Sequence, residues 1–265
     1  MTMQAFFQIH PAAAVAFSGG VDSAWLLHEA VRYAQKTAAY FVRTPFQPAF
    51  ELDDARRTSR LLGAALTVVD FDILAIPEAA SNPPDRCYHC KRALFSRILA
   101  QARADGFDHV LDGGNASDDA SDRPGMRALR ELGQLEKELA ALRELGVLSP
   151  LRLCGLAKSD IRRLAREAGI PVWDKPSYAC LATRIPAGTP ITQADLARVE
   201  RGEGKLTALG FADPRLRLRG EDALLQVRPE QLEEARERLA EIAELLAGEA
   251  RRLELDPAGR ESREV

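Results

Sequence analysis

The stretch FSGGVDS, residues 17–23, lies between a short apolar run at 12–17 and the segment SAWLLHEAVRYAQ, whose apolar residues recur at helical spacing. This order predicts a strand, a tight loop and a helix. A glycine pair lets the backbone approach a ligand closely, serines supply hydroxyl groups, and the N–H groups at a helix start favour an anion. The stretch therefore predicts a phosphate-binding loop. The alternative is a plain strand-to-helix turn with a Ser or Asp cap.

The same order of elements recurs further along the chain. Strands are predicted at TAAYFVR, ALTVVDF and HVLDGG, and helices at AFELDDARRTSRLLG and KRALFSRILAQARADG. Strands that alternate with helices form a parallel sheet covered by those helices. The sequence therefore predicts an α/β fold with a parallel sheet and helices on both faces.

The order changes after the Pro- and Gly-rich stretch IPVWDKPSYACLATRIPAGTPIT, which begins at residue 170. A helix at 192–209, strands at RLRLRG and ALLQVRP, a helix at 229–247 and a final RRLELDP predict a small α+β domain with a hairpin. We therefore predict one domain at 1–178 and a second at 179–265.

A near-repeat precedes that stretch. RALRELG at 127–133 is followed by the similar AALRELG at 140–146. This period is too short for a solenoid repeat, so we interpret the segment as a small tandem duplication.

The charges are nearly balanced, with 36 Lys and Arg against 39 Asp and Glu and a net charge of −3. No overall positive field attracts nucleic acid, so a small molecule is the expected partner. No apolar run approaches the roughly 18 residues of a membrane span, and the start of the chain lacks the basic residues of a secretory signal. We therefore expect a cytoplasmic protein that does not contact a membrane.

Four cysteines raise the question of metal binding. Cys87 and Cys90 form a C-x-x-C pair just before a predicted helix, and Cys180 lies in KPSYACLATRIP; we interpret Cys154 as a small buried residue. A disulfide is disfavoured in a reducing cytoplasm, and zinc would need further ligands. Three thiolates would suit a 4Fe-4S cluster with one open iron. The alternative, that the pair only packs a helix start, stays open.

A second polar loop, DGGNASDD at 112–119, follows another predicted strand. The carboxyl ends of parallel strands meet at one edge of the sheet, so this loop is expected to form the second wall of the nucleotide site. The candidate nucleotide-binding residues of the two loops are Ser18, Gly19, Gly20, Val21, Asp22, Ser23, Gly113, Asn115 and Asp118.

The motif S-G-G-x-D-S resembles the pyrophosphate loop (PP-loop) of the ATP pyrophosphatase superfamily. Further stretches, NPPDRCYHCKRALF, SPLRLCGLAKSDIRRLAREAGIPVWDKPSYACLATRIP and RLRLRG, occur in the order found in the LarE family of ATP-dependent sulfur transferases. The resemblance covers roughly residues 12–230. It implies an adenine nucleotide hydrolase-like PP-loop domain followed by a sulfur-transfer and substrate-binding domain.

The resemblance implies a specific reaction. LarE enzymes use ATP and Mg²⁺ to adenylate a carboxylate of pyridinium-3,5-biscarboxylic acid mononucleotide, and they replace it with a thiocarboxylate for the nickel-pincer nucleotide cofactor of lactate racemase. Asp22 would help to place Mg²⁺. In some members a cysteine that matches Cys180 gives up its own sulfur and becomes dehydroalanine. The additional Cys87 and Cys90 resemble the subgroup in which three cysteines hold a 4Fe-4S cluster that delivers sulfide.

The same resemblance assigns further residues. Arg215 and Arg217 would bind the substrate phosphate, with Glu203 as a weaker match; Arg219 lies on the same strand face. Arg184 follows Cys180 by four residues and would favour its thiolate if the segment turns helically. The alternative for the arginines is a solvated basic strand face. A cysteine desulfurase or another sulfide source is an expected partner, and a homo-oligomer is the expected assembly.

Two competing functions share these features. A PP-loop tRNA thiolase would use the same loop and cysteine chemistry, but it should have a basic surface. A nucleotide-binding module without catalysis would bind ATP and release no pyrophosphate. Three cysteines around the loops argue against the second alternative.

Overall fold

The computed structural model describes residues 1–119 and 146–260. The near-repeat therefore lies outside the described residues except for Gly146. Within them, no helix is both long enough and apolar enough to cross a membrane.

The described chain divides into two compact units, each continuous in space but not in sequence. The first comprises Met1–Thr44, Ala49–Ile73 and Cys87–Ser177, and the second comprises Pro45–Pro48, Leu74–Arg86 and Tyr178–Val265. The second unit thus includes two short stretches from the first half of the sequence, which the sequence analysis did not anticipate.

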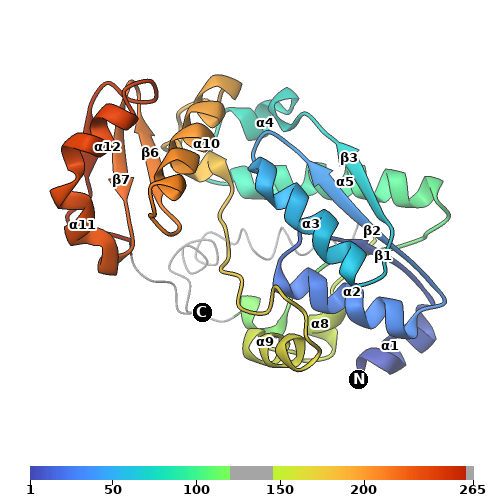
Figure 1. The fold of residues 1–265 in the computed structure, drawn as a ribbon. Coiled ribbons are helices and arrows are strands. Elements are labelled where there is room, and N and C mark those ends of the chain that lie inside the picture. Colours follow the sequence, from blue (N-terminus) through green and yellow to red (C-terminus); the bar gives the residue numbers. More distant parts are fainter. Residues whose placement is uncertain (120–145, 261–265) are drawn as a thin grey trace. The chain divides into compact units, whose positions relative to one another are not determined.

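The first unit is built on a five-stranded parallel sheet in the order β3-β2-β1-β4-β5 (Figure 1). Its strands are β1 (Ala12–Ala16), β2 (Lys36–Arg43), β3 (Leu66–Asp70), β4 (Val110–Leu111) and β5 (Val147–Leu148). Its helices are α1 (Met3–Ile9), α2 (Val21–Tyr33), α3 (Ala49–Leu61), α5 (Arg86–Ala104), α8 (Pro150–Leu153) and α9 (Lys158–Glu167), and η2 (Ala116–Asp119) is a 3-10 turn. The predicted parallel α/β fold is confirmed.

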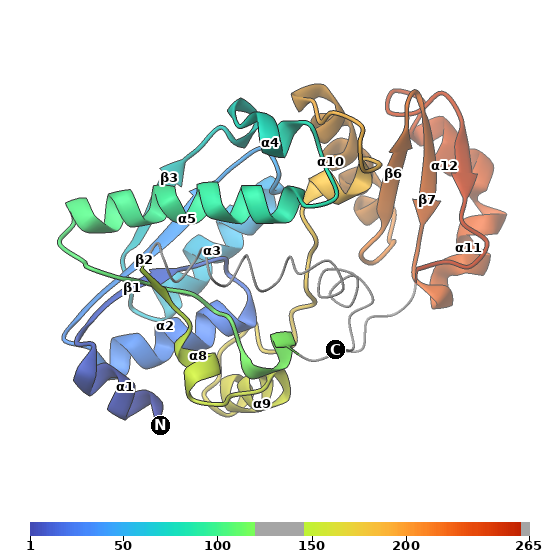
Figure 2. The same cartoon turned by 180° about the vertical axis from the view of Figure 1, so that it is seen from behind.

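Helices cover both faces of this sheet, as predicted. Figures 1 and 2 show α2 and α3 on one face and α5 on the other. Successive strand residues point to opposite faces, so Ala13, Val15 and Phe41 join the core around α2, whereas Ala14 and Tyr40 join the core beneath α5. The sheet is therefore buried on both sides, which explains its nearly uninterrupted apolar strands.

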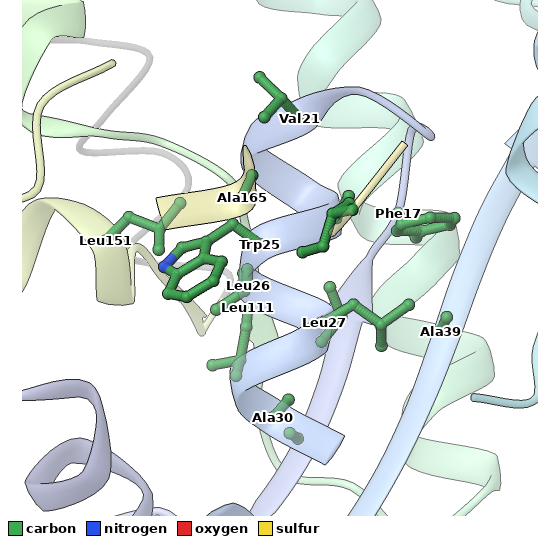
Figure 3. Packing of buried hydrophobic residues seen from close by; sticks show 14 of the residues in the cluster. Phe17, Val21, Trp25, Leu26, Leu27, Ala30, Ala39, Leu111, Leu151 and Ala165 are labelled. Atoms are coloured by element: carbon green, nitrogen blue, oxygen red, sulfur yellow. The ribbon is translucent and has the colours of Figure 1, made fainter. Parts of the chain in front are cut away.

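Helix α2 is fixed in place by apolar contacts along most of its length. Figure 3 shows Trp25 on α2 beside Leu151 of α8 and Ala165 of α9, and all three side chains are buried. Burying one large apolar side chain stabilises a protein by about 1.5–3 kcal/mol. This packing holds the start of α2, and hence the loop at 17–20, against the sheet.

One local prediction in this unit was wrong. The helix expected after the cysteine pair begins already at Arg86, so Cys87 and Cys90 lie in its first turns. At the start of α9 the N-cap residue is Ala157, whose N–H donates to Asp160 Oδ2 at 3.2 Å. Beyond the end of α9, Gly169 has a φ of 69°, as is common just after a helix.

The second unit contains a mixed three-stranded sheet. Strands β6 (Arg215–Arg219) and β7 (Asp222–Gln226) form the predicted antiparallel hairpin, and β8 (Leu253–Leu255) pairs with β7 in parallel. The other elements are η1 (Ile73–Ala75, with Ile73 in the first unit), α4 (Pro77–Ala80), η3 (Leu181–Arg184), α10 (Gln193–Ala208), η4 (Pro229–Gln231), α11 (Leu232–Glu237) and α12 (Leu239–Leu245). The single helix predicted at 229–247 is wrong, because the chain breaks its helical conformation at Arg238.

Gly202 allows close packing of α10 on β6, and its replacement is expected to destabilise the protein. A Cβ atom at Gly202 would lie 2.4 Å from Leu216 Cδ2, and Leu216 is fully buried. Overpacking of this kind costs about 1–3 kcal/mol. Gly202→Ala should therefore lower the free energy of unfolding measured by urea denaturation. Gly204→Ala is the matched control, because Gly204 is exposed on the same helix with open space around it. Alanine there should stabilise by about 0.5–1 kcal/mol, and equal effects at both positions would contradict the packing argument.

Candidate functional site

The loop at 17–20 connects β1 to α2 and is organised by its own Ser18 and by Ser23 of α2. Ser23 Oγ donates to the Gly20 carbonyl at 3.0 Å, and the N–H of Ser18 donates to Ser23 Oγ at 3.3 Å. Gly20 is the N-cap residue of α2 and has no side chain to cap the first turn. The first N–H groups of a helix have no partner within the helix, and they carry partial positive charge. The loop can therefore receive an anion.

Glycine is required at two positions of this edge. Gly19 has a φ of 75°, and a Cβ there would lie 3.2 Å from the Ala55 backbone. Gly113, which follows β4, lies against the first loop, since a Cβ there would approach Ser23 N to 3.2 Å. The two predicted loops therefore meet, and they do so where the strand order reverses between β1 and β4. Ligands of open parallel sheets bind at such a switch point.

The predicted residues of the second loop contact the first. Asn115 is buried, and its Nδ2 donates to Asp22 Oδ1 at 3.4 Å. The Asn115 N–H donates to Asp118 Oδ2 at 2.8 Å, which closes the turn. The structure thus brings together Asp22, Gly113, Asn115 and Asp118 beside the first loop.

Two cations at this edge were missed by the sequence analysis. Lys158, the first residue of α9, forms a short ion pair with Asp22 through its Nζ, and its N–H donates to Ser117 Oγ at 2.9 Å. Arg152 Nε donates to the Asn115 carbonyl at 3.4 Å. Both residues belong to the stretch PLRLCGLAK, in which isolated basic residues gave no sequence signal of a binding site.

In the second unit, Glu203 is the centre of a buried polar cluster. Arg184 Nε and Nη2 donate to its two carboxylate oxygens at 2.7 and 3.0 Å, and the Tyr178 hydroxyl donates to the same carboxylate. The Leu216 N–H donates to Glu203 Oε1 at 3.0 Å. The side chains of Arg184 and Glu203 are 1% and 7% exposed. Glu203, predicted to bind substrate phosphate, is therefore engaged by the protein itself.

Burial and neighbouring charges shift the pKa values in this cluster. Burial works against the charged form of Arg184, but the hydrogen bonds and charge of Glu203 raise the pKa of Arg184 above its ordinary value. Burial, with the charge of Glu203, also raises the pKa of Tyr178. Arg184 and Tyr178 thus keep the protonated forms that donate to Glu203.

Arg215 and Arg217 lie on one face of β6, as predicted. Arg215 is buried, so the alternative of a solvated basic strand face does not hold for it. Its Nη1 lies 2.6 Å from Asp213 Oδ1. Its Nη2 is buried without a hydrogen-bond partner among the described residues. Burial and the charge of Arg184 lower the pKa of Arg215 to about 10. Arg217 Nη1 donates to the Thr183 carbonyl at 2.9 Å. Arg219 is exposed and pairs with Glu254.

The four cysteines form no disulfide. Cys180 is partly exposed and is the N-cap residue of η3, and Arg184 Nη1 donates to its carbonyl oxygen at 3.1 Å. Cys154 packs against the core of the first unit, and burial raises its pKa. Cys87 and Cys90 belong to the first unit and Cys180 to the second. Across the described ranges, no three Cys, His, Asp or Glu side chains are gathered to hold a metal, so the three-thiolate ligand set is not found there.

A glycine–serine loop at the switch point of a parallel sheet, faced by a lysine and a second polar loop, is typical of proteins that bind phosphate groups, as PP-loop proteins do. No protein-family model matches the chain. The sequence is 33% identical to an uncharacterized protein of Synechocystis sp. over 88% of this chain and 82% of that protein. It is 31% identical to the pyridinium-3,5-bisthiocarboxylic acid mononucleotide synthase of Lactiplantibacillus plantarum, over 80% of this chain and 73% of the synthase.

A more distant similarity reaches the tRNA-specific 2-thiouridylase MnmA of Thermotoga petrophila, at 26% identity over 61% of this chain and 53% of that enzyme. The chain belongs to the PP-loop ATP pyrophosphatase family, in which it is a homologue of LarE. Its homologues of known activity are ATP-dependent enzymes that insert sulfur.

Proposed function

We propose that the protein is an ATP-dependent sulfur transferase of nickel-pincer nucleotide synthesis, with pyridinium-3,5-biscarboxylic acid mononucleotide as its substrate. The observation that carries the proposal is the presence of two groups of residues in one chain, each within its own unit. The first unit holds a PP-loop with Lys158 and Asp22, and the second holds Cys180 beside buried arginines. The similarity to the Lactiplantibacillus plantarum synthase supports this substrate.

The residues of the first unit would carry out the adenylation. A substrate carboxylate oxygen attacks the α-phosphorus of ATP. The bond between that phosphorus and the oxygen that bridges the α- and β-phosphates breaks, and pyrophosphate leaves. The loop at 17–20 and Lys158 would hold the departing pyrophosphate. Mg²⁺ takes only one or two protein carboxylates and leaves other positions to phosphates and water, so Asp22 alone is a sufficient protein ligand. The ion would offset charge that develops on the phosphates.

The arginines of the second unit would bind the phosphate of the mononucleotide. The buried Nη2 of Arg215 has no partner within the described ranges, and an unsatisfied buried donor costs about 1–3 kcal/mol. A phosphate oxygen that accepts from this group would remove the cost. Glu203 would then act as a positioning residue that holds Arg184, rather than as a ligand of the phosphate.

Cys180 is the proposed centre of sulfur delivery. In the sacrificial route its sulfur attacks the adenylated carbon and AMP leaves. The Cβ–S bond then breaks as the Cα proton is removed, which leaves a thiocarboxylate and dehydroalanine. The alternative is the predicted 4Fe-4S cluster of Cys87, Cys90 and Cys180. Because that ligand set is not gathered in the described residues, no step is assigned to the cluster, and its presence stays a prediction.

Exchange of labelled pyrophosphate into ATP tests the adenylation. The wild type should catalyse exchange only when the biscarboxylic mononucleotide is present. Lys158→Gln should lower this exchange by on the order of 10²-fold, because it removes a preorganised cation from the charge that develops on the leaving group. Substrate-independent exchange, or none at all, would refute the proposed reaction.

Lys36→Gln is the control for charge removal. Lys36 is an exposed lysine whose Nζ donates to the Asp105 carbonyl at 2.7 Å, at the opposite end of the parallel strands. Its exchange rate should equal that of the wild type. Equal losses in the Lys158 and Lys36 variants would show that Lys158 acts only through the overall charge or the fold.

A tRNA substrate is the second candidate, favoured by the similarity to the 2-thiouridylases. The chain spans about half of their length, and its net charge of −3 provides no general attraction for a polyanion. A gel shift with tRNA that weakens with salt would support this candidate over the mononucleotide.

A further inference from the structure

Two stretches that are distant in the sequence are tied together in the second unit. One is SNPPDR at 81–86, immediately before the C-x-x-C pair, and the other is the Cys180 loop, which we define as residues 178–191. Asn82 Nδ2 donates to the Pro186 carbonyl at 2.8 Å and to the Ile185 carbonyl at 3.3 Å. The Gly188 N–H donates back to the Asn82 carbonyl at 2.8 Å.

Arg86 extends this connection toward Cys180. Its Nη1 donates to the Ala182 carbonyl at 3.1 Å and makes a short hydrogen bond to Asn82 Oδ1. Asn82 is 1% exposed and Arg86 is 9% exposed. Buried polar groups are kept only where they are satisfied, so these contacts are part of the architecture of the loop and not a chance surface association.

Asn82 makes these contacts from a left-handed backbone conformation, which is uncommon for residues other than glycine. Its φ is 56°, and the following residue is Pro83, which disfavours helical conformations at the position before it. Such outliers persist where the surrounding structure over-determines them, and they cluster at functional sites. Here the outlier aims the Asn82 side chain at the loop that carries Cys180.

The remaining contacts of the loop show what Asn82 and Arg86 add. Immediately next to Cys180, the Leu181 N–H donates to the Phe46 carbonyl at 2.8 Å. The Cys180 carbonyl itself accepts from the Thr183 hydroxyl at 2.8 Å. These contacts fix the backbone close to the cysteine. Asn82 and Arg86 donate to the carbonyls of Ala182, Ile185 and Pro186, which follow Cys180 in the loop.

We infer that Asn82 and Arg86 are positioning residues for Cys180: they fix the loop so that the thiol keeps one orientation toward the activated carboxylate. This inference rests on the proposed function only in assigning sulfur delivery to Cys180. It gives the residues before the C-x-x-C pair a role that does not depend on a metal.

The test compares Asn82→Ala and Arg86→Met with Arg86→Lys and with Glu78→Ala, a control at an exposed position of the preceding helix α4. The first readout is the rate at which iodoacetamide alkylates Cys180, followed by peptide mass spectrometry without ATP. Cys154, in the first unit, is the internal reference. The second readout is single-turnover thiocarboxylate formation, measured beside pyrophosphate exchange.

Asn82→Ala and Arg86→Met should speed alkylation of Cys180 several-fold and leave Cys154 unchanged. They should slow sulfur transfer by on the order of 10²-fold, the effect of a misplacement of about 1 Å, while pyrophosphate exchange stays near the wild-type rate. Arg86→Lys should show smaller changes than Arg86→Met in both the alkylation rate and the sulfur-transfer rate, and Glu78→Ala should match the wild type.

Unchanged alkylation of Cys180 in Asn82→Ala would overturn the inference. A parallel rise at Cys154 with loss of pyrophosphate exchange would also overturn it, because the two residues would then act on the fold as a whole. If the wild type makes no thiocarboxylate, the proposed function fails, and the alkylation rates still decide whether Asn82 and Arg86 position Cys180.

Discussion

Cys180→Ala is expected to abolish thiocarboxylate formation while leaving substrate-dependent pyrophosphate exchange close to the wild-type rate. The PP-loop and Lys158 belong to the first unit and make their contacts without Cys180. The backbone at Cys180 is held through its carbonyl oxygen, which accepts from the Thr183 hydroxyl and from Arg184. Alanine keeps those contacts and removes only the sulfur. The measurement is the mass of the nucleotide product after a single turnover, alongside the exchange rate.

Cys154→Ala is the matched control, since it removes a partly buried thiol from the first unit and should leave both rates unchanged. Retained sulfur transfer in Cys180→Ala would eliminate the sacrificial route and the cluster route together. The two routes are then separated in the wild type. A protein mass that falls by the loss expected for dehydroalanine indicates the sacrificial route. About four irons per chain after anaerobic reconstitution, lost in Cys87→Ala, would indicate the cluster.

Glu203→Ala is expected to lower the free energy of unfolding by about 3–5 kcal/mol, the cost of removing one partner of a buried ion pair. The substitution leaves the guanidinium of Arg184, 1% exposed, without its carboxylate. It also removes the acceptor of the Tyr178 hydroxyl and of the Leu216 N–H. Urea denaturation monitored by circular dichroism gives the change in free energy.

Glu249→Ala is the control for Glu203→Ala, because it also removes a buried carboxylate, but one whose cationic partners are partly exposed to solvent. The side chain of Glu249 is 4% exposed and pairs with Lys205 and Arg201, but these cations are 39% and 55% exposed. Water can solvate them once the carboxylate is gone, so the loss should stay near 1 kcal/mol, as for exposed ion pairs. Equal losses of unfolding free energy in the two variants would show that the buried charge of Arg184 does not determine the destabilisation.

The PP-loop was predictable because its geometry selects particular residue types. A left-handed backbone at Gly19 and close approach at Gly113 select glycine, and both leave a mark in the sequence. Lys158 was missed because a lysine at a helix start resembles a solvated surface residue. Only the packing of α9 on α2, through residues such as Trp25 and Ala165, brings it to Asp22.

The second unit was harder to predict because its contacts are non-local. Glu203 matches an acidic family position, yet its engagement by Arg184 and Tyr178 depends on how η3 packs against α10. Asn82 and Arg86 donate mainly to backbone carbonyls, which every residue type supplies. The residues that accept such hydrogen bonds therefore show no sequence pattern. The helix break at Arg238 also has no sequence signal, since the surrounding residues favour helix.

The composite second unit has a consequence for how this protein can be divided or exchanged. Because Pro45–Pro48 and Leu74–Arg86 belong to it, the piece from Tyr178 onward is not a self-contained cassette. A graft of that piece onto another PP-loop enzyme would leave behind the acceptor at Phe46 and the donors at Asn82 and Arg86. Recombination at the apparent boundary would therefore produce chimaeras whose Cys180 loop lacks these three anchors.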